Sequence, residues 1–420
     1  MWLRLRTYQL IFGSKGGITM AVYLDSIPDV APRIHRPDTR RWLYFLGGIM
    51  VTGNALTFWL WAGERTGLVF WFMASGLPFC LWGLIFSIRR FGYKCDQVWA
   101  TSWDRERSQL LEQETARGQR AAWVLNSGII TQLGSGSEKL LKAIKSAESQ
   151  LNVQIPRSGG MPVRHSRLPG FYDQQQSQDL DLALKTIASH IKPVLAKIPV
   201  GVPCLLIADC DIAGVPDADE QILNILTLQT GRAFRLLHAK GFTAFDFWLD
   251  EEWKQPTILI AVSAAVHAVP QENEGEAITW TLLLNRNHSD FPDAVRLHRP
   301  EKGSISTLCK TLGRALLWGK IPAKMVTGSC TTGNSLTVGG EWSSACEGNG
   351  LIFSMTEANR DVDQTTGYTG KAAPWLAVTL ATTIAQKGGP QVVVAETNPG
   401  EIWVVGITPG NKTEINQDLS

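Results

Sequence analysis

Two apolar segments near the N-terminus constrain this chain more than any other feature of its sequence. No charged residue occurs between Trp42 and Ala62, and none occurs between Leu68 and Ile88. Each segment has about the twenty residues that a helix needs to cross the hydrocarbon core of a bilayer. Because only residues 63–67 separate the segments, we expect an antiparallel transmembrane hairpin over residues 42–90, with both outer ends on one side.

Basic residues flank the two outer ends of this hairpin. Arg40 and Arg41 stand just before the first segment, and Arg89 and Arg90 follow the second. Further basic residues close by are Arg33, Arg36 and Lys94. Because loops rich in Lys and Arg stay in the cytoplasm, we expect a multi-pass protein of the inner (cytoplasmic) membrane with both termini and its soluble part in the cytoplasm.

Two other interpretations of the N-terminal region explain less of its sequence. A helical hairpin buried in a soluble core would tolerate Pro78 and the glycines, but it would not explain the flanking charges and the aromatic ends. A cleaved signal peptide is not expected, because the first nineteen residues lack a continuous apolar centre. Met20 is an alternative start of the chain.

Charge and cysteine usage exclude several classes of function. The formal net charge is only +2, so the sequence lacks the basic excess of a nucleic-acid-binding protein. None of the seven histidines has a neighbour at a metal-ligand spacing, and the cysteines form no C-x-x-C pair. We therefore expect no metal or cofactor, and a reducing compartment. The seven cysteines are Cys80, Cys95, Cys204, Cys210, Cys309, Cys330 and Cys346.

The rest of the chain has the pattern of a layered α/β protein. We expect an N-terminal segment over residues 1–41, a helical and linker region over 91–178, and an α/β domain over 179–420. Short, continuous apolar strands between helices indicate a buried sheet. The predicted helices are 96–125, 138–150, 179–196, 218–240, 304–317 and 371–386; the predicted strands are 129–133, 203–208, 257–262, 277–284, 350–354, 391–396 and 401–407. Residues 156–178 are expected to be a polar connection, and 324–340 are ambiguous.

Two short motifs could mark binding sites, but each has a simpler interpretation. Residues 328–335 have the spacing of a phosphate-binding loop, yet Asn334 stands where the lysine should be, so we expect a turn-rich segment. Asp209 and Asp211 follow a predicted strand, where α/β proteins often place their sites. A lone pair of aspartates is weak evidence for a metal, so a solvated loop is the favoured interpretation.

The segment from Asp363 to Ala377 carries the most information. Alone it predicts a helix N-terminus with small residues, followed by two paired strands. It also resembles the thiolase and ketoacyl-synthase superfamily, in which a Gly-His-Thr-Gly turn opens a long helix; here the turn is Gly367, Tyr368, Thr369 and Gly370. The Gly275-Glu276-Ala277 turn before a strand fits the same layout. The resemblance covers residues 180–410 and implies a thiolase-like fold.

The departures from that family imply a degenerate site. Thiolase-type chemistry requires a cysteine activated at a buried helix N-terminus, together with histidines. The helix that should carry the nucleophile begins around Asp217 and has no cysteine, and Tyr368 replaces a histidine. The region from Thr327 to Thr332 lacks the other expected histidine. The resemblance therefore implies a pseudoenzyme that retains the fold without the chemistry.

The plan of a two-helix anchor joined to an inactive thiolase-like domain is also similar to proteins of Gram-negative bacteria encoded beside type VI secretion lipase effectors. This resemblance extends over residues 297–303, 317–322 and 361–375. It implies an adaptor that binds a secreted lipase effector or the spike that carries it, and it leaves a homodimer possible.

The sequence leaves one alternative function open, which is an acyl-transfer or condensing enzyme acting on lipid-linked or CoA/ACP-linked substrates. A transport role for the hairpin is disfavoured, because its spans contain no ionisable residue of the kind that marks an ion path.

Overall fold

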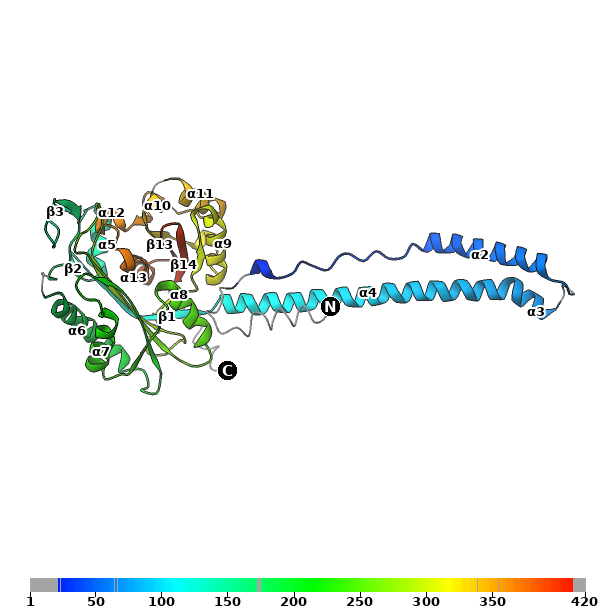
Figure 1. The fold of residues 1–420 in the computed structure, drawn as a ribbon, viewed down its shortest axis with the longest axis horizontal. Helices are drawn as coiled ribbons and strands as arrows, with labels where there is room; N and C mark the ends of the chain where they lie inside the picture. The colour runs from blue at the N-terminus through cyan, green and yellow to red at the C-terminus, as the bar shows by residue number, and fades with distance from the viewer. Residues whose placement is uncertain are drawn as a thin grey trace. The chain divides into compact units, whose positions relative to one another are not determined.

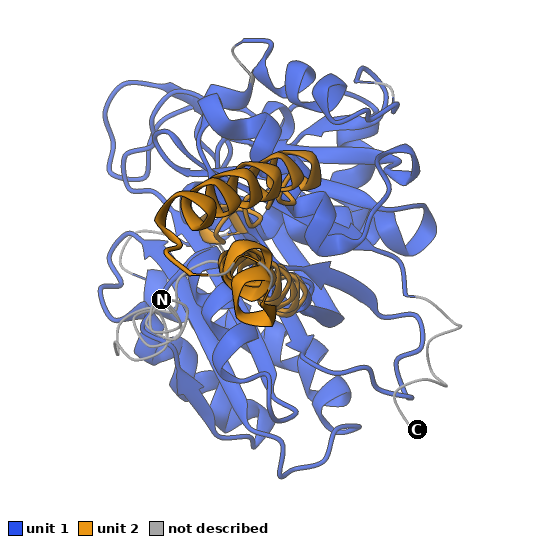
Figure 2. Ribbon diagram, turned by 90° about the vertical axis from the view of Figure 1, so that its right-hand side faces the viewer, with its two compact units in different colours: residues 1–22, 116–420 blue, residues 23–115 orange. Residues whose placement is uncertain are grey.

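The computed structural model describes residues 22, 24–63, 65, 67–171, 175–337, 339–353 and 355–410. The chain divides into two compact units, one of residues 23–115 and one of residues 1–22 and 116–420, which Figure 2 colours separately. Residues 1–21 and 23 of the predicted segment 1–41, which include the alternative start Met20, lie outside the described residues. The two units are described in turn below.

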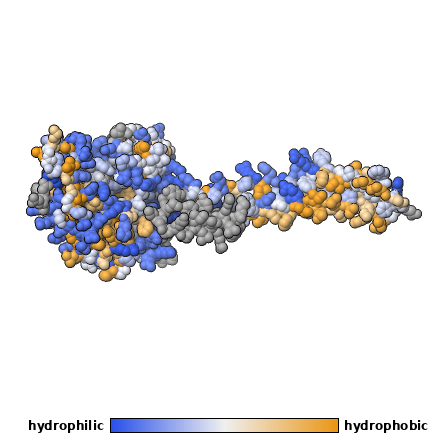
Figure 3. Space-filling model, viewed as in Figure 1, coloured by the Kyte–Doolittle hydropathy of each residue, from blue (hydrophilic) through white to orange (hydrophobic). Residues whose placement is uncertain are grey.

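The unit of residues 23–115 is built from helices (Figure 1). The predicted apolar segments form two helices that are long and apolar enough to span a membrane. Hydrophobic side chains are concentrated over this helical pair in Figure 3. The most apolar stretch of α2 is 0% buried, and that of the second helix is 17% buried, so the apolar surface is largely uncovered. The elements are η1 (Leu24–Ser26), α2 (Thr39–Leu60), α3 (Leu68–Trp71), the π-helical η2 (Phe72–Gly76) and α4 (Leu77–Gly118).

The two apolar helices pack closely at a glycine. A Cβ atom on Gly53 would collide with the ring of Pro78, so only glycine allows this approach. Proline has no N–H and its ring crowds the preceding turn, which explains why the π-helical η2 occupies the turn before Pro78. At the other end of the pair, the Trp82 indole donates a hydrogen bond to the carbonyl of Trp42 (3.0 Å).

The helix predicted over 96–125 ends earlier than expected. It is the second half of α4, which stops at Gly118, and residues 121–131 form strand β1 (Ala121–Thr131) instead. A Cβ atom on Gly118 would collide with the buried Trp318 indole, so the helix ends where only glycine fits. Because β1 lies inside the large sheet, part of the predicted linker region 91–178 belongs to the α/β unit.

A twelve-stranded mixed sheet forms the centre of this unit, and its two halves have matching strand orders. One half runs β6-β5-β7-β8-β1 and the other β12-β11-β13-β14-β9, and they meet where β1 pairs with β9 in antiparallel fashion. The strands are β5 (Cys204–Ile212), β6 (Phe234–Leu236), β7 (Ile258–Val266), β8 (Ala277–Leu284), β9 (Val295–His298), β11 (Gly328–Thr332), β12 (Asn359–Asp361), β13 (Gln391–Asn398) and β14 (Glu401–Thr408).

Short strands complete the sheet or stand beside it. Strand β2 (Gly134–Ser135) pairs with β1, and β10 (Glu301–Gly303) pairs with β14. Strands β3 (Asn152–Gln154) and β4 (Val163–His165) form a separate antiparallel hairpin.

Helices cover both faces of each half, so the unit has five layers. In β5, Leu205 and Ile207 belong to a central core with α5, α8 and α13, whereas Leu206 faces an outer core with α6 and α7. The other half of the sheet packs against α9 and α11 in a third core. The helices are α5 (Ser137–Lys145), α6 (Gln176–Leu195), α7 (Ala218–Thr230), α8 (Gly241–Glu251), α9 (Leu308–Gly319), α10 (Asn334–Thr337), α11 (Glu341–Gly348), α12 (Asp363–Thr366) and α13 (Ala373–Lys387), with the short 3-10 turns η3 (Ile305–Thr307), η4 (Ala323–Met325) and η5 (Gly370–Ala372).

Most predicted elements of this unit are confirmed, and three are corrected. The predicted helix 218–240 breaks at Gly231, which takes a left-handed conformation (φ 73°) and is followed by β6 and then α8. No strand is described over residues 350–353 of the predicted strand 350–354; residue 354 lies outside the described residues. The polar connection 156–178 contains β4 and the start of α6, and the ambiguous segment 324–340 contains η4, β11 and α10.

Candidate functional site

The matching halves of the sheet identify α8 and α13 as equivalent helices. Helix α8 connects β6 to β7, and α13 connects β12 to β13. They contact each other in the central core, where the Trp375 ring lies 5.4 Å from that of Phe242 and 6.0 Å from that of Phe245. The helix that begins around Asp217, to which the family resemblance assigned the nucleophile, is α7 and packs in an outer layer, whereas the central helix α8 begins at Gly241.

Charged residues gather at the N-termini of the two central helices. Lys240 stands directly before α8 and donates a hydrogen bond to the carbonyl of Ala208 (2.6 Å). A Cβ atom on Gly241 would lie 3.3 Å from a carboxylate oxygen of Asp209. Burial raises the pKa of Asp209, and the charges of Lys371 and Lys240 oppose that rise. Asp209 therefore lies near two lysines, Lys240 before α8 and Lys371 before α13. Asp211, two residues later on β5, is exposed.

The turn of Gly367, Tyr368, Thr369 and Gly370 packs against the connection between β7 and β8. The N–H of Tyr368 donates to the carbonyl of Asn273, and its carbonyl accepts from the N–H of Gly275, both at 3.0 Å. Gly367 has φ 76°, and a Cβ there would lie 2.7 Å from the carbonyl oxygen of Glu274. Glycine is therefore required at Gly367 by conformation and by space.

The Tyr368 phenol is held in its neutral form. Its hydroxyl donates to the carbonyl of Glu396 (3.3 Å). Burial raises the pKa of Tyr368 to about 12, and the carboxylates of Asp363, Glu396 and Glu274 add to the shift. A phenol with this pKa is a poor proton carrier at neutral pH.

His267 lies beside the turn of Gly367, Tyr368, Thr369 and Gly370, and its sequence neighbours do not mark it as a site residue. It is the first residue after β7, and its N–H donates to the Glu276 carboxylate (3.1 Å). A Cβ on Gly370 would lie 3.9 Å from its ring, and its Nε2 atom is buried without a hydrogen-bond partner. The signal in the sequence is its position directly after a strand whose residues are apolar except for Ser263.

The segment with phosphate-loop spacing offers its backbone donors to carboxylates of this chain. The N–H of Gly333 donates to Asp363 (2.7 Å), whose other oxygen accepts from the Thr332 hydroxyl (2.8 Å). The N–H of Ser335 donates to Glu396 (3.0 Å). Burial raises the pKa of Asp363 to about 7, with Asp361 and Glu396 adding to the rise. The N–H groups of Gly333 and Ser335 already donate to carboxylates of this chain, so they are not available to bind a phosphate.

A hairpin beside this region exposes apolar side chains. The connection between β3 and β4 is held to the chain after β7 by Ser158, whose N–H and hydroxyl both donate to the carbonyl of Ala268. Val153 is 71% exposed, Met161 is 83% exposed, and Val269, next to Ala268, is 62% exposed. We call residues 152–165 with Val269 the hairpin tip.

Four of the five thiols of the α/β unit have raised pKa values. Burial raises the pKa of the Cys204 thiol, and it raises that of Cys210, Cys330 and Cys346 to about 12. Among the described residues, no hydrogen bond joins a cysteine to a histidine. In the same described ranges, no three His, Cys, Asp or Glu side chains gather where they could hold a metal ion.

The predicted membrane flanks lie in the helical unit. Arg40 and Arg41 are in the first turn of α2, and Arg89 and Arg90 are in α4. Asp38 accepts from the N–H of Arg40 (3.0 Å) and pairs with the Arg41 side chain (3.5 Å). Asp38 therefore both caps α2 and partly balances its basic start.

Comparison with solved structures shows which fold the chain adopts. It is similar to the ketosynthase from module 1 of the bacillaene synthase of Bacillus amyloliquefaciens FZB42, with a TM-score of 0.51 and 9% identity over 70% of this chain and 77% of the other. It is also similar to ketosynthase twelve of the bacillaene polyketide synthase of Bacillus amyloliquefaciens, with a TM-score of 0.50 and 9% identity over 70% and 74%. No family model and no curated protein matches the sequence. The chain therefore has a mixed α/β, thiolase-like fold after an N-terminal region with two apolar helices.

Proposed function

We propose that this chain is a membrane-anchored, catalytically inactive thiolase-like protein that acts as an adaptor by binding a partner protein. The observation that carries the proposal is the start of α8, where Lys240 and Gly241 stand in place of a cysteine. A thiolate nucleophile needs the positive end of a helix or nearby cations to lower its pKa. In this chain that position holds a lysine side chain already engaged with the Ala208 carbonyl.

The state of the buried thiols supports the same proposal. The pKa values of Cys210, Cys330 and Cys346 are raised to about 12 by burial, so almost none of each thiol is ionised at neutral pH. A raised pKa is the reverse of what acyl transfer through a thioester requires.

The hairpin tip is the surface that we assign to the partner. Val153, Met161 and Val269 expose apolar side chains at a position where backbone bonds hold the two loops together. Exposed apolar side chains that lie together on a domain surface commonly mark a protein interface. The partner we propose is a secreted lipase effector of type VI secretion or the spike that carries it.

The anchor would place this surface in the cytoplasm. The largely uncovered apolar surface of the helical pair needs lipid to cover it, and the basic flanks Arg40, Arg41, Arg89 and Arg90 favour a cytoplasmic location for both outer ends. A protein held there can keep a toxic cargo at the inner membrane before export.

A pull-down of the full chain tests the adaptor proposal. The tagged protein is solubilised in mild detergent from its native host, together with V153D/M161D and the control L182D/L228D, which changes two exposed leucines on α6 and α7. We expect wild type and control to recover the same effector or spike protein, and V153D/M161D to recover less than a tenth as much. Recovery of no secretion protein by the wild type would refute the adaptor role, and equal recovery by V153D/M161D would refute the assigned surface.

A condensing or acyl-transfer enzyme acting on lipid-linked or CoA/ACP-linked substrates is the second candidate. His267 favours it, because its buried Nε2 has no partner and it lies beside Gly370. Mild alkylation of the folded protein tests this candidate through Cys204, Cys210, Cys309, Cys330 and Cys346. A catalytic thiolate among these five would react much faster than the exposed Cys95, whereas labelling of all five no faster than Cys95 would leave the reaction without a nucleophile.

A further inference from the structure

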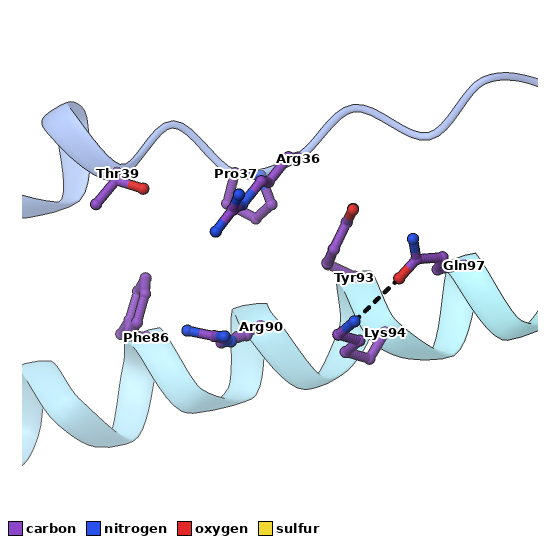
Figure 4. A pocket seen from close by; sticks show the side chains of 8 residues that line it. All are labelled: Arg36, Pro37, Thr39, Phe86, Arg90, Tyr93, Lys94 and Gln97. Atoms are coloured by element: carbon purple, nitrogen blue, oxygen red, sulfur yellow. Dashed lines mark hydrogen bonds between the residues drawn. The ribbon is translucent and has the colours of Figure 1, made fainter.

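A small cavity lies in the helical unit between the extended stretch before α2 and the middle of α4. Its volume is about 280 Å³, near the lower end for small-molecule sites. Figure 4 shows the side chains that line it, which come from both segments. They are Arg36, Pro37, Thr39, Phe86, Arg90, Tyr93, Lys94 and Gln97.

Three cations converge on this cavity, and no carboxylate lines it. Arg90 and Lys94 lie four residues apart on one face of α4, an arrangement in which like charges repel each other. Arg36 faces them from the opposite segment (Figure 4). In the described part of this unit, Arg36 and Arg90 have no ion pair, and Lys94 bonds only to the Gln97 amide oxygen (3.1 Å). The nearby Asp38 is used by the start of α2 and by Arg41.

Neutral side chains complete the lining of the cavity: three of them can form hydrogen bonds, and Phe86 is apolar. Thr39, Tyr93 and Gln97 bring a hydroxyl, a phenol and an amide to the lining. Phe86 contacts two indoles at the end of the apolar pair: its ring lies 5.1 Å from that of Trp82 and 5.4 Å from that of Trp42. Indoles at such a position favour the headgroup level of a bilayer.

The position of the cavity along the sequence decides the class of ligand. Its basic residues lie just outside the charge-free stretches, which begin at Trp42 and end at Ile88. In an inserted hairpin these residues lie at the depth of lipid phosphates, and Phe86 lies within the adjoining charge-free stretch. Basic pockets beside transmembrane helices on the cytoplasmic side bind the headgroups of anionic lipids.

We propose that this cavity binds the phosphate of an anionic phospholipid. Arg36 and Arg90 supply planar guanidinium groups that can form paired hydrogen bonds with phosphate oxygens, and Lys94 supplies a point charge. The bound lipid relieves the repulsion among the three cations and joins the segment before α2 to α4. This inference rests on the membrane anchor of the proposed function, but it does not depend on the identity of the partner.

Lipid retention by the purified full chain tests the proposal. The protein is extracted in neutral detergent, stripped of lipid, and mixed with micelles that contain phosphatidylglycerol, cardiolipin or phosphatidylcholine, and bound lipid is counted by native mass spectrometry. The variants are R36Q/R90Q/K94Q and the control R40Q/R41Q/R89Q, which removes three charges from the same end of the hairpin but none from the cavity.

We expect one tightly held anionic lipid on the wild type and on the control. The cavity variant should bind it roughly 100-fold more weakly, which corresponds to about 1 kcal/mol for each cation. Equal weakening in both triple variants would overturn the proposal in favour of diffuse surface attraction. Equal retention of phosphatidylcholine would also overturn it.

Two further measurements separate the possible sources of failure. Displacement of the lipid by millimolar inorganic phosphate would show that the cavity prefers a free anion, which overturns the lipid assignment. Carbonate extraction of membranes reports insertion for each variant. A wild-type chain that is extracted by carbonate would refute the membrane anchor itself, whereas an inserted chain without bound lipid would refute only this inference.

Discussion

Arg157 and Glu276 form an ion pair that is almost completely removed from solvent, with 1% of each side chain exposed. The Arg157 Nε atom lies 3.2 Å from one carboxylate oxygen, and Glu276 also accepts from the N–H groups of Leu168 (2.9 Å) and His267 (3.1 Å). Arg157 donates in addition to the carbonyl of Gly170 (3.0 Å). The pair therefore fixes the hairpin tip beside the candidate site.

Removal of one partner from this pair should cost more than removal of both. R157M leaves the Glu276 carboxylate buried without its cation, and we expect a loss of about 3–5 kcal/mol in the free energy of unfolding. R157M/E276Q should recover part of that loss, because no buried charge remains, although the carbonyls bound by Arg157 stay unpaired. Thermal unfolding of the detergent-solubilised chain measures both effects. A double variant less stable than either single variant would contradict this account.

Asp363 should make the α/β unit less stable as the pH rises. Its folded-state pKa of about 7 lies above the 3.8 of a free carboxyl, so the folded protein holds the proton more tightly. The stabilisation from Asp363 is complete below about pH 4 and is lost as the pH rises through 7, by an amount on the order of 4 kcal/mol. D363N cannot ionise, so its melting temperature relative to wild type should rise between pH 5 and pH 8. The exposed control D290N should show no such trend.

Asp250 should have the opposite dependence on pH. Its carboxylate accepts from Arg117 (2.6 Å), Arg120 (3.0 Å) and Arg299 (2.5 Å). Burial alone would raise the pKa of Asp250, but the hydrogen bond from Arg117 and the charge of Arg299 lower it overall.

The stabilisation from Asp250 is therefore present above the unfolded pKa near 4 and is lost as the pH falls through the lower folded value. D250N should cost about 3–5 kcal/mol at pH 7, because Arg299 is 1% exposed and loses a partner. The difference in melting temperature between D250N and wild type should narrow between pH 7 and pH 3.5. A difference that widens over this range would show that the charge of Asp250 does not stabilise the folded state.

The sequence predicted the fold well where elements are long and apolar. The predicted strand 277–284 has the same bounds as β8, and the pattern also predicts β7, β13 and β14, because each contains an apolar run that starts after a polar turn. Strand β1 was missed before residue 129, because Asn126, Ser127 and Gly128 interrupt its apolar pattern. Gly128 is required there by a distant residue: a Cβ would collide with the Trp280 indole of β8.

The candidate site could be predicted only in part, for a similar reason. The turn from Gly367 to Gly370 is contiguous, so a family resemblance was enough to locate it. Lys240 and Asp209 lie near each other because α8 starts beside β5, and His267 follows β7, which pairs in parallel with β5. These are long-range features of the fold. The pattern predicts 218–240 as one helix because Gly231 alone interrupts it, so the separate start of α8 at Gly241 cannot be read from the sequence.

The orientation of the proposed membrane anchor can be measured with a native cysteine. Cys95 is exposed on α4, seven residues after the charge-free segment ends at Ile88. In a chain whose other six cysteines are replaced by alanine, a membrane-impermeant maleimide should label Cys95 in spheroplasts only after permeabilisation, because the basic flank keeps that end in the cytoplasm. In a matched chain with C95A and R65C, the loop between the two apolar helices should react in intact spheroplasts. Labelling of Cys95 from outside, with protection of the loop, would reverse the orientation and place the thiolase-like unit on the far side of the membrane, away from any cargo awaiting export.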